Sequence, residues 1–388
     1  MRILLASSSS GSRGGGEIYL LYLGRELAAL EHQPVLWCSR HPRMDALARE
    51  FGEFAEVVRD DYTNTYDLRL RSLAALWRGG IGRRLAENWR RLEPDVVHVN
   101  KQNLEDGLEL LAAADACGLP RLCTIHLTQS ARYLRAQSAW PRDWVARRLL
   151  RRFGGEFIAV QEQRSVDLER FLGGGGERIH SVHNGVPVPD AGELDEARQR
   201  QRRQLGIGER ELLVVGLGRL MPQKRPQLFL DLAARIRGAL PQARFLWLGS
   251  GWLDDRWQDW VGGRGLADCV ERIPWTRDVA AHLAAADVFL HTAQYEGMPL
   301  ALFEAMACGL PCLLTPNLLD DMPFLPADCV LPVDGDWLDA LRDRGRLAAI
   351  GRRARSLVSG TFSTRRMALA TLDVYAAARG RRHPQATP

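Results

Sequence analysis

The segment "DVFLHTAQYEGMPLALFEAMACGLPCLLT" (287–315) decides the fold class of this chain. The apolar stretch 287–292 predicts a β-strand, and Pro299 suits the first position of a helix because its fixed φ and missing N–H cost nothing there. Gly309 predicts the end of that helix, and the apolar run 311–315 predicts a second strand. Two strands joined by a crossover helix form the repeating unit of a parallel sheet.

The same alternation of apolar strands and longer helical patterns extends in both directions from this segment. Because 388 residues exceed the size at which one hydrophobic core stops growing, we expect two α/β domains, each a Rossmann-like doubly wound sheet. The natural boundary lies in "HNGVPVPDAGELDEARQR" (183–200), where Pro, Gly and charge replace apolar periodicity. The predicted strands are 2–7, 34–39, 95–100, 121–127 and 156–160 in the first half, and 212–218, 243–249, 269–274, 287–292 and 311–315 in the second.

Composition narrows the class of protein further. The net charge of +5 gives no indication of a nucleic-acid partner. The start of the chain lacks the apolar stretch of a signal peptide, and no run of about 18 apolar residues is present, so we expect a cytoplasmic protein. The 7 cysteines are mostly far apart and mostly inside apolar segments, which predicts reduced core residues.

Two carboxylates interrupt the apolar segment 292–315. Glu296 stands in the loop that leaves the carboxyl end of a predicted strand, where ligands bind in open α/β sheets. Glu304 lies within the predicted helix and needs hydroxyl or cationic partners if it is buried. Its two oxygens suit the neighbouring hydroxyls of a ribose, and the free N–H groups at the helix start suit a phosphate. A salt bridge from Glu304 to a core arginine remains the alternative.

The E-x7-E spacing of "EGMPLALFEAMACGLP" (296–311) resembles the retaining GT-B glycosyltransferases of family 4, and other motifs follow in the family's order. The resemblance implies the GT-B fold, with an acceptor domain at 1–186, a nucleotide-sugar domain at 187–360, and a helix in 361–388 that returns to the first domain. The supporting motifs are "GSRGGGE" (11–17), "TIHLT" (124–128), "HNGV" (183–186), "GLGRLMPQK" (216–224), "IPWTRDV" (273–279) and "TFSTRRMALATLDVY" (361–375).

The resemblance also implies an activity and a set of site residues. It implies transfer of a sugar from a UDP- or GDP-sugar to an acceptor hydroxyl on a lipid-linked glycan or polysaccharide precursor, with retention of configuration and without a metal or other cofactor. His126, Arg219, Lys224 and Glu296 are the implied catalytic residues, with Arg219 and Lys224 on the diphosphate. The implied donor-binding residues are Gly15, Gly16, Arg219, Lys224, Trp275, Thr276, Glu296, Gly297, Met298, Leu300 and Glu304.

Three positions depart from the pattern of the family. Arg225 follows Lys224 where many relatives have glycine, which leaves open whether Arg225 also grips the phosphates. Leu127 stands where aspartate is frequent, and Gln161 where serine is frequent. These two departures put the choice of donor in doubt more than the activity.

Other functions have weaker support in the sequence. "GSRGGGE" does not fit the dinucleotide pattern G-x-G-x-x-G, which argues against an NAD-dependent oxidoreductase. A metal-dependent glycosyltransferase would need a D-x-D pair, which Asp334 and Asp336 could form. Asp336 is better placed as the N-cap of the helix that follows. A sugar-nucleotide epimerase, transfer to a soluble small acceptor and an inactive binding scaffold remain the alternatives.

Arginine is concentrated in two stretches of the first half, 68–91 and 132–152. If 142–153 is helical, Val145, Leu149, Leu150 and Phe153 share one arc. The opposite arc carries Trp144, Arg147, Arg148, Arg151 and Arg152, a combination that suits an anionic membrane surface. We therefore predict that this arc places the enzyme peripherally on a membrane that holds its acceptor. The alternative is that the arc is only a solvated helix face.

Overall fold

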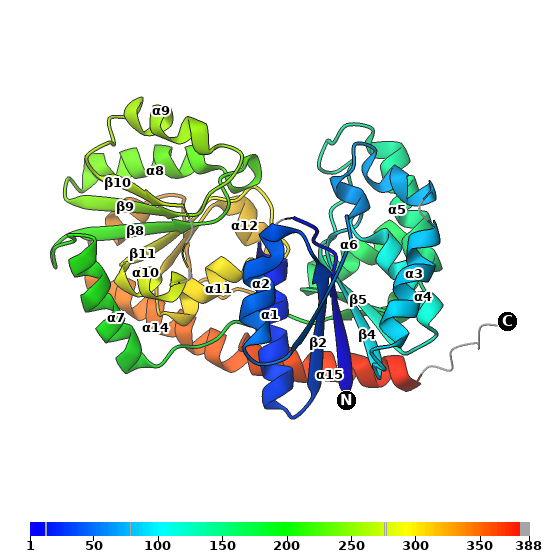
Figure 1. The fold of residues 1–388 in the computed structure, drawn as a ribbon. Coiled ribbons are helices and arrows are strands. Elements are labelled where there is room, and N and C mark those ends of the chain that lie inside the picture. The colour runs from blue at the N-terminus through cyan, green and yellow to red at the C-terminus, as the bar shows by residue number, and fades with distance from the viewer. Residues whose placement is uncertain (12–13, 78, 275, 277, 381–388) are drawn as a thin grey trace. The chain divides into compact units, whose positions relative to one another are not determined.

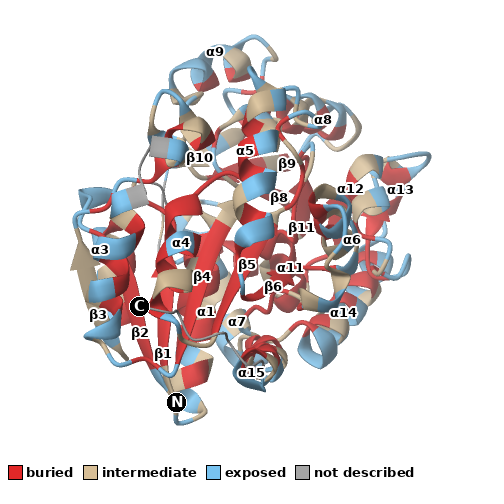
Figure 2. Ribbon diagram, turned by 90° about the vertical axis from the view of Figure 1, so that its right-hand side faces the viewer, coloured by how far each residue is buried: buried red, intermediate tan, exposed pale blue. Residues whose placement is uncertain are grey.

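The computed structural model describes residues 1–11, 14–77, 79–274, 276 and 278–380. The chain divides into two compact units. The N-terminal unit contains Met1–Gly185 together with the chain from Thr364 onward, and the C-terminal unit contains Val186–Ser363. In each unit the central strands of the sheet are buried and the outer helical faces are exposed (Figure 2).

The N-terminal unit is built on a parallel sheet, which within the described residues has 7 strands in the order β3-β2-β1-β4-β5-β6-β7. All five strands predicted in this half are confirmed. The edge strands β3 and β7 were missed, because both are short and only partly buried and so lack a strong apolar signal. The strands are β1 (Arg2–Ser7), β2 (Gln33–Ser39), β3 (Glu56–Asp60), β4 (Val96–Asn103), β5 (Arg121–Leu127), β6 (Glu156–Ala159) and β7 (Ile179–Ser181).

Helices cover both faces of this sheet. One face packs against α3, α4, α5 and α6 through a core that includes Trp89, Leu111 and Leu150. The C-terminal helix α15 packs against α1, β5 and β6 (Figure 1). The helices are α1 (Gly15–Ala29), α2 (Asp45–Gly52), α3 (Gly79–Arg90), α4 (Leu108–Cys117), α5 (Ala139–Arg152), α6 (Glu162–Leu172) and α15 (Thr364–Gly380), with short 3₁₀ turns η1 (Pro42–Met44), η2 (Thr65–Asp67), η3 (Arg71–Trp77) and η4 (Gly176–Arg178).

The C-terminal unit repeats the same plan, with the described strands in the order β10-β9-β8-β11-β12-β13, all parallel. The five strands predicted here are confirmed, and only the two-residue β13 was missed. The strands are β8 (Leu212–Leu217), β9 (Ala243–Leu248), β10 (Val270–Ile273), β11 (Val288–His291), β12 (Cys312–Leu314) and β13 (Leu331–Pro332). The helices are α7 (Ala191–Gln204), α8 (Pro226–Ala239), α9 (Trp257–Gly262), α10 (Val279–Ala285), α11 (Leu300–Ala307), α12 (Pro316–Asp321), α13 (Trp337–Ala340) and α14 (Arg344–Thr361), with 3₁₀ turns η5 (Pro222–Lys224) and η6 (Asp254–Arg256).

Helix α11 has the predicted end and a slightly different start. Gly309 has φ +77°, and its N–H donates to Met306 O while the Leu310 N–H donates to Ala305 O. This pair of bonds is a Schellman motif, which satisfies carbonyls that the helix end leaves free. Pro299 is the N-cap residue and not the first helical residue, so that prediction was wrong by one position.

Both sheets have a point where the strand order reverses, between β1 and β4 in one unit and between β8 and β11 in the other. Ligands of doubly wound sheets bind beside the carboxyl ends of strands at such a point. The glycine-rich segment follows β1, the loop with Arg219 and Lys224 follows β8, and the loop with Glu296 follows β11. The fold therefore places most of the predicted site residues at the two switch points.

Candidate functional site

Two loops meet at the switch point of the C-terminal unit, residues 218–225 after β8 and residues 292–299 after β11. The Thr292 hydroxyl donates to Lys224 O at 2.9 Å, and the Gln294 amide donates to Gln223 O at 2.7 Å. The Gln223 side chain donates back to Tyr295 O at 3.0 Å. These bonds hold the two loops in register with each other.

The loops bring Lys224 and Glu296 into a direct ion pair. Glu296 is only 7% exposed, and its Oε1 also lies 3.5 Å from Nε2 of His291 at the end of β11. Burial raises the pKa of Glu296, but Lys224 and His291 outweigh it and lower the pKa to about 2. Burial lowers the pKa of His291, although Glu296 opposes this. At neutral pH the cluster is an ionised carboxylate, an ammonium and a neutral imidazole.

The side chain of Lys224 packs against a glycine. The aliphatic stem of Lys224 crosses Gly218, where an added Cβ would lie 3.2 Å from three of its carbons. Gly218 also has φ +157°, a conformation that residues with side chains rarely adopt. Arg219 follows with an exposed side chain. Because an ammonium has three N–H donors, Lys224 keeps donors for an anionic ligand while it is paired with Glu296.

Arg225, whose role the sequence left open, holds the loop after β11. Its Nε donates to Thr292 O at 2.6 Å, and its Nη2 donates to Ala293 O at 2.9 Å. The same Nη2 lies 3.0 Å from the Thr315 hydroxyl and 2.8 Å from Asn317 Oδ1. The backbone of Arg225 is left-handed, with φ +47°, which explains why glycine suits this position. The guanidinium is thus a clamp on the loop that carries Glu296.

Most of the remaining donor-site residues predicted in this unit lie at or near the start of α11. Gly297, Met298 and Leu300 are buried at the helix start, and Glu304 is partly buried one turn further on. The argument from full burial therefore applies to Glu296 and not to Glu304. Thr276 accepts a hydrogen bond from the Asp278 amide at 3.0 Å. Trp275 lies outside the described residues.

In the N-terminal unit, Gly15 and Gly16 form the first turn of α1. An added Cβ at Gly16 would lie 2.0 Å from the side-chain nitrogen Nε2 of Gln102, so a larger residue would displace the Gln102 side chain, whereas nothing lies within 4 Å at Gly15. Gln102 donates to Glu17 Oε1 at 3.0 Å, and the other Glu17 oxygen accepts from the Gly14 amide at 2.6 Å. The start of α1 is therefore fixed to the end of β4.

His126 is the penultimate residue of β5 and is 8% exposed. Its Nε2 lies 2.9 Å from Asn100 Oδ1, and its ring meets the Tyr19 ring edge-on, with 4.8 Å between centroids. Burial lowers the pKa of His126 to about 4. The imidazole is therefore neutral at physiological pH, and it acts as a hydrogen-bonding group and not as a cation.

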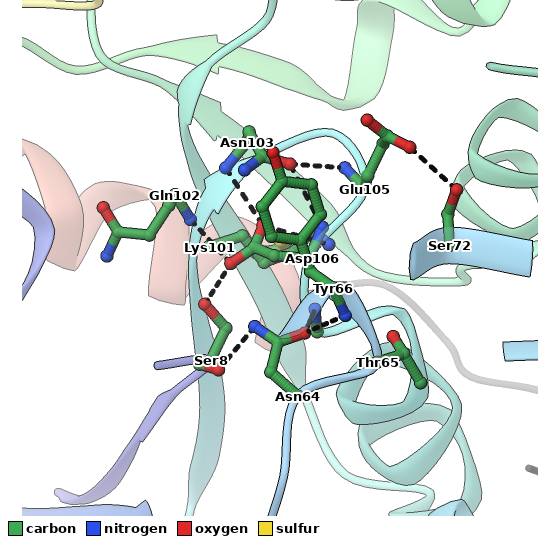
Figure 3. A network of polar contacts seen from close by, with 12 residues as sticks. Ser8, Asn64, Thr65, Tyr66, Ser72, Lys101, Gln102, Asn103, Glu105 and Asp106 are labelled. Atoms are coloured by element: carbon green, nitrogen blue, oxygen red, sulfur yellow. Dashed lines mark hydrogen bonds and ion pairs between the residues drawn. The ribbon is translucent and has the colours of Figure 1, made fainter. Parts of the chain in front are cut away.

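A buried polar network secures the ends of β1 and β4 around these residues (Figure 3). Asp106 accepts from the Ser8 hydroxyl and from the amides of Gln102 and Asn103, the two amides at 3.0 Å each. Lys101 is fully buried with its Nζ 3.7 Å from Asp106 Oδ1. The sequence analysis did not predict this network, because its members are ordinary polar residues from separate parts of the chain.

The predicted basic helix is α5, and on its apolar arc Val145, Leu150 and Phe153 are buried and Leu149 is partly buried. Trp144 is 51% exposed, with the Arg148 guanidinium 5.7 Å above its ring. Arg147, Arg151 and Arg152 are also exposed. Helix α5 packs against η3, a contact that the sequence did not predict. Further apolar side chains are exposed on this part of the unit. They are Leu70, Leu76, Tyr133 and Trp140.

Two other expectations concern metals and membranes. Among the described residues, no group of three or more His, Cys, Asp or Glu side chains is arranged to hold a metal ion. Asp336 stands at the N-cap of α13, but the predicted capping bond from its side chain is missing. Within the same residues, every helix is too short or too polar to cross a bilayer.

Comparison with known families decides the assignment. Residues 197–318 match the family described as glycosyl transferases group 1, and residues 13–188 match glycosyltransferase family 4. The chain is a group 1 GT-B glycosyltransferase. The first match lies within the C-terminal unit and the second almost entirely within the N-terminal unit. Together they include the segments that carry Lys224, Glu296 and His126.

Individual relatives of this glycosyltransferase agree with the family. It is 30% identical over 36% of its length to the Escherichia coli UDP-Gal:alpha-D-GlcNAc-diphosphoundecaprenol alpha-1,3-galactosyltransferase. It is 28% identical over 56% of its length to the Mycolicibacterium smegmatis GDP-mannose-dependent alpha-(1-6)-phosphatidylinositol monomannoside mannosyltransferase. These matches span only 36% and 60% of the two relatives' own lengths.

The fold agrees with solved GT-B structures. The HepE protein of Anabaena, crystallised with UDP and glucose, superimposes with a TM-score of 0.74, covering 97% of this chain and 100% of the other. The sequence identity between the two is 18%. At that identity the likeness establishes the shared fold of this glycosyltransferase.

Proposed function

We propose that this glycosyltransferase moves a hexosyl group from a nucleotide-diphosphate sugar to a hydroxyl of a lipid-linked glycan or polysaccharide precursor. The observation that carries the proposal is the ion pair of Lys224 with the buried Glu296 at the C-terminal switch point, beside the start of α11. The two relatives named above use UDP-galactose and GDP-mannose, which supports a UDP- or GDP-sugar as the donor.

Each residue has a role in this proposal. Lys224 and Arg219 stabilise the negative charge that grows on the departing diphosphate, and the N–H groups at the start of α11 bind the same phosphates. Glu296 holds hydroxyls of the sugar, and Glu304 accepts from the ribose hydroxyls. In the N-terminal unit, Gly15, Gly16 and His126 contact the donor or the transferred sugar.

The proposed reaction retains the anomeric configuration. The bond between the anomeric carbon and the diphosphate oxygen breaks, the acceptor oxygen bonds to the same face of that carbon, and the acceptor proton passes to the diphosphate. Glu296 is committed to Lys224 and to sugar hydroxyls, so no carboxylate is proposed as a nucleophile. Proton NMR of the first product tests this point, and an inverted linkage contradicts it.

The donor is tested by thermal shift with a panel of UDP- and GDP-sugars, followed by turnover of the best binder. We expect one donor to stabilise the protein and to be hydrolysed slowly without an acceptor. An epimerised nucleotide sugar as the product would establish the epimerase alternative. Tight binding with no turnover, with or without glycan acceptors, would establish a binding scaffold.

The proposed reaction needs no metal, because fixed cations from the protein meet the diphosphate charge. We expect activity to survive EDTA. Complete loss that Mg²⁺ or Mn²⁺ restores would contradict this part of the proposal.

The basic surface of α5 supports a lipid-borne acceptor, as do the acceptors of both relatives, a diphosphoundecaprenol and a phosphatidylinositol derivative. Arginines bind lipid phosphates, and exposed aromatic side chains such as Trp140 and Trp144 prefer the interface. We propose that this surface docks on an anionic leaflet.

Vesicle co-sedimentation tests the docking. Wild-type protein should bind anionic vesicles, and high salt should release it. Changing Arg147, Arg148, Arg151 and Arg152 together to Ser should abolish binding, whereas the same number of Ser substitutions at Arg200, Arg203, Arg210 and Arg256 in the other unit should not. Equal binding to neutral vesicles, or none, would contradict docking and favour a soluble acceptor.

A further inference from the structure

Asn100 bridges the start of α1 and His126 through two hydrogen bonds of opposite polarity. It lies in β4 and is fully buried. Its Nδ2 donates to Gly16 O at 3.1 Å, and its Oδ1 lies 2.9 Å from His126 Nε2. The amide therefore links the glycine-rich turn to the imidazole inside one unit.

The chemistry of these partners fixes where the histidine proton sits. A backbone carbonyl only accepts hydrogen bonds, so the Asn100 group that faces Gly16 must be the NH₂. The Asn100 group that faces His126 is then the carbonyl oxygen, which also only accepts. The proton must therefore be on Nε2 of His126. The Gly16 carbonyl thus determines the tautomer through a single intervening side chain.

The second ring nitrogen is left as an acceptor. Burial lowers the pKa of His126 to about 4, so near pH 7 the ring carries one proton, and Nε2 has it. Tyr19 of α1 packs edge-on against the ring, its hydroxyl lies 3.4 Å from Thr124, and His98 of β4 is a neutral neighbour. Within the described residues, Nδ1 has no hydrogen-bond partner in the protein.

We propose that Asn100 is a positioning residue that holds His126 as the Nε2–H tautomer, so that Nδ1 accepts a hydrogen bond from a sugar hydroxyl. The identity of that ligand rests on the proposed function, but the tautomer does not. A bare lone pair selects a group with a hydrogen to donate. It follows that a neutral hexosyl group is favoured over a uronosyl group whose carboxylate would meet Nδ1.

The tautomer is measured directly by NMR on the full chain with isotopically labelled histidine ring nitrogens, because protonated and bare ring nitrogens have very different shifts. The wild-type protein at about pH 7 should show His126 with a proton on Nε2 and none on Nδ1. A cationic ring or an Nδ1–H ring in the wild type overturns the proposal, whether or not any variant folds.

Two variants sharpen the measurement. Asn100→Ala removes the acceptor, and the His126 signal should shift toward a mixture of tautomers. Asn100→Asp keeps an acceptor for Nε2–H, but its charge should raise the pKa of His126. His98, which bonds Tyr375 at 2.9 Å and Thr124 at 2.8 Å, is the internal control in Asn100→Ala, where its tautomer should stay unchanged. Unchanged His126 signals in Asn100→Ala contradict the role of Asn100.

Kinetics then connects the tautomer to the reaction. Asn100→Ala should lower kcat/KM about tenfold, the loss expected for one hydrogen bond of about 1.4 kcal/mol. In Asn100→Asp the acid limb of the pH profile should move to higher pH, because the ring becomes cationic at a higher pH. A loss of activity that is the same at all pH values in Asn100→Asp would indicate a structural role alone. If no nucleotide sugar is turned over, the proposed function fails while the NMR result still stands.

Discussion

The predicted site residues of the two units differ in their electrostatics. In the C-terminal unit the site is an ion pair, with Lys224 against a Glu296 whose pKa is about 2. In the N-terminal unit the predicted sugar-contacting group is neutral, an imidazole of pKa about 4 held by an amide. A charged ligand group fits beside the first cluster and a neutral hydroxyl beside the second, so the polarity of each unit indicates which part of a substrate it binds.

The largest expected effect comes from removing the cation. Lys224→Ala should lower kcat by about two to three orders of magnitude, because the charge on the diphosphate grows toward the transition state. Steady-state kinetics measures this directly. Arg237→Ala is the matched control, since its surface ion pair with Asp268 lies on α8 away from the loops, and it should leave kcat unchanged. A fall in kcat of less than tenfold in Lys224→Ala would contradict the proposal that Lys224 stabilises the charge on the diphosphate.

Glu304→Gln should act on binding and not on chemistry. Loss of a charged acceptor for the ribose should weaken nucleotide affinity by about 1.5 to 3 kcal/mol, which titration calorimetry with UDP or GDP measures. Glu271→Gln, an exposed carboxylate on β10 of the same unit, serves as the control. If kcat falls instead while affinity is unchanged, Glu304 does not bind the nucleotide.

Variants of Arg225 test whether this residue acts through its hydrogen bonds or through its charge. Arg225→Gly suits φ +47° but removes the clamp on the Glu296 loop, and kcat/KM should fall about tenfold. Arg225→Lys keeps the charge without the planar fork that reaches Thr292 and Asn317, so it should not rescue activity. Full activity in the lysine variant would mean that the charge of Arg225, and not its hydrogen bonds, matters.

The smallest effect is on stability. The folded pKa of Glu296 lies below its ordinary value of 4.5, so its stabilising contribution is present above about pH 4.5 and is lost as the pH falls toward 2. The difference in unfolding free energy between wild type and Glu296→Gln should therefore become smaller as the pH falls from about 6 to about 3. Urea unfolding across this range measures it. A difference that grows on acidification contradicts the lowered pKa.

Local signals made the fold predictable. Apolar runs located β1 and β11 within a residue or two, and Gly309 located the end of α11, because strand burial and helix termination are decided by neighbouring residues. The missed strands β3, β7 and β13 lack that local signal, since they are short edge strands.

The partners of the site residues were not predictable in the same way. The motifs indicated Lys224 and Glu296, yet not that they pair with each other. The roles of Arg225, His291 and Asn100 depend on contacts between loops far apart in the sequence. A carboxamide in a strand such as Asn100 carries no signal of its own, and its meaning appears only when Gly16 and His126 lie on either side of it.

The placement of α15 has a consequence for synthesis on the ribosome. The helix belongs to the N-terminal unit, where the buried Tyr375 hydroxyl lies 2.9 Å from His98, although the whole C-terminal unit intervenes in the sequence. At about 5–20 residues per second, the first unit waits roughly 10 to 40 seconds for the helix that completes it. During that interval the nascent chain exposes the sheet face that α15 later covers, so a truncation after Ser363 should leave the first unit permanently in this aggregation-prone state.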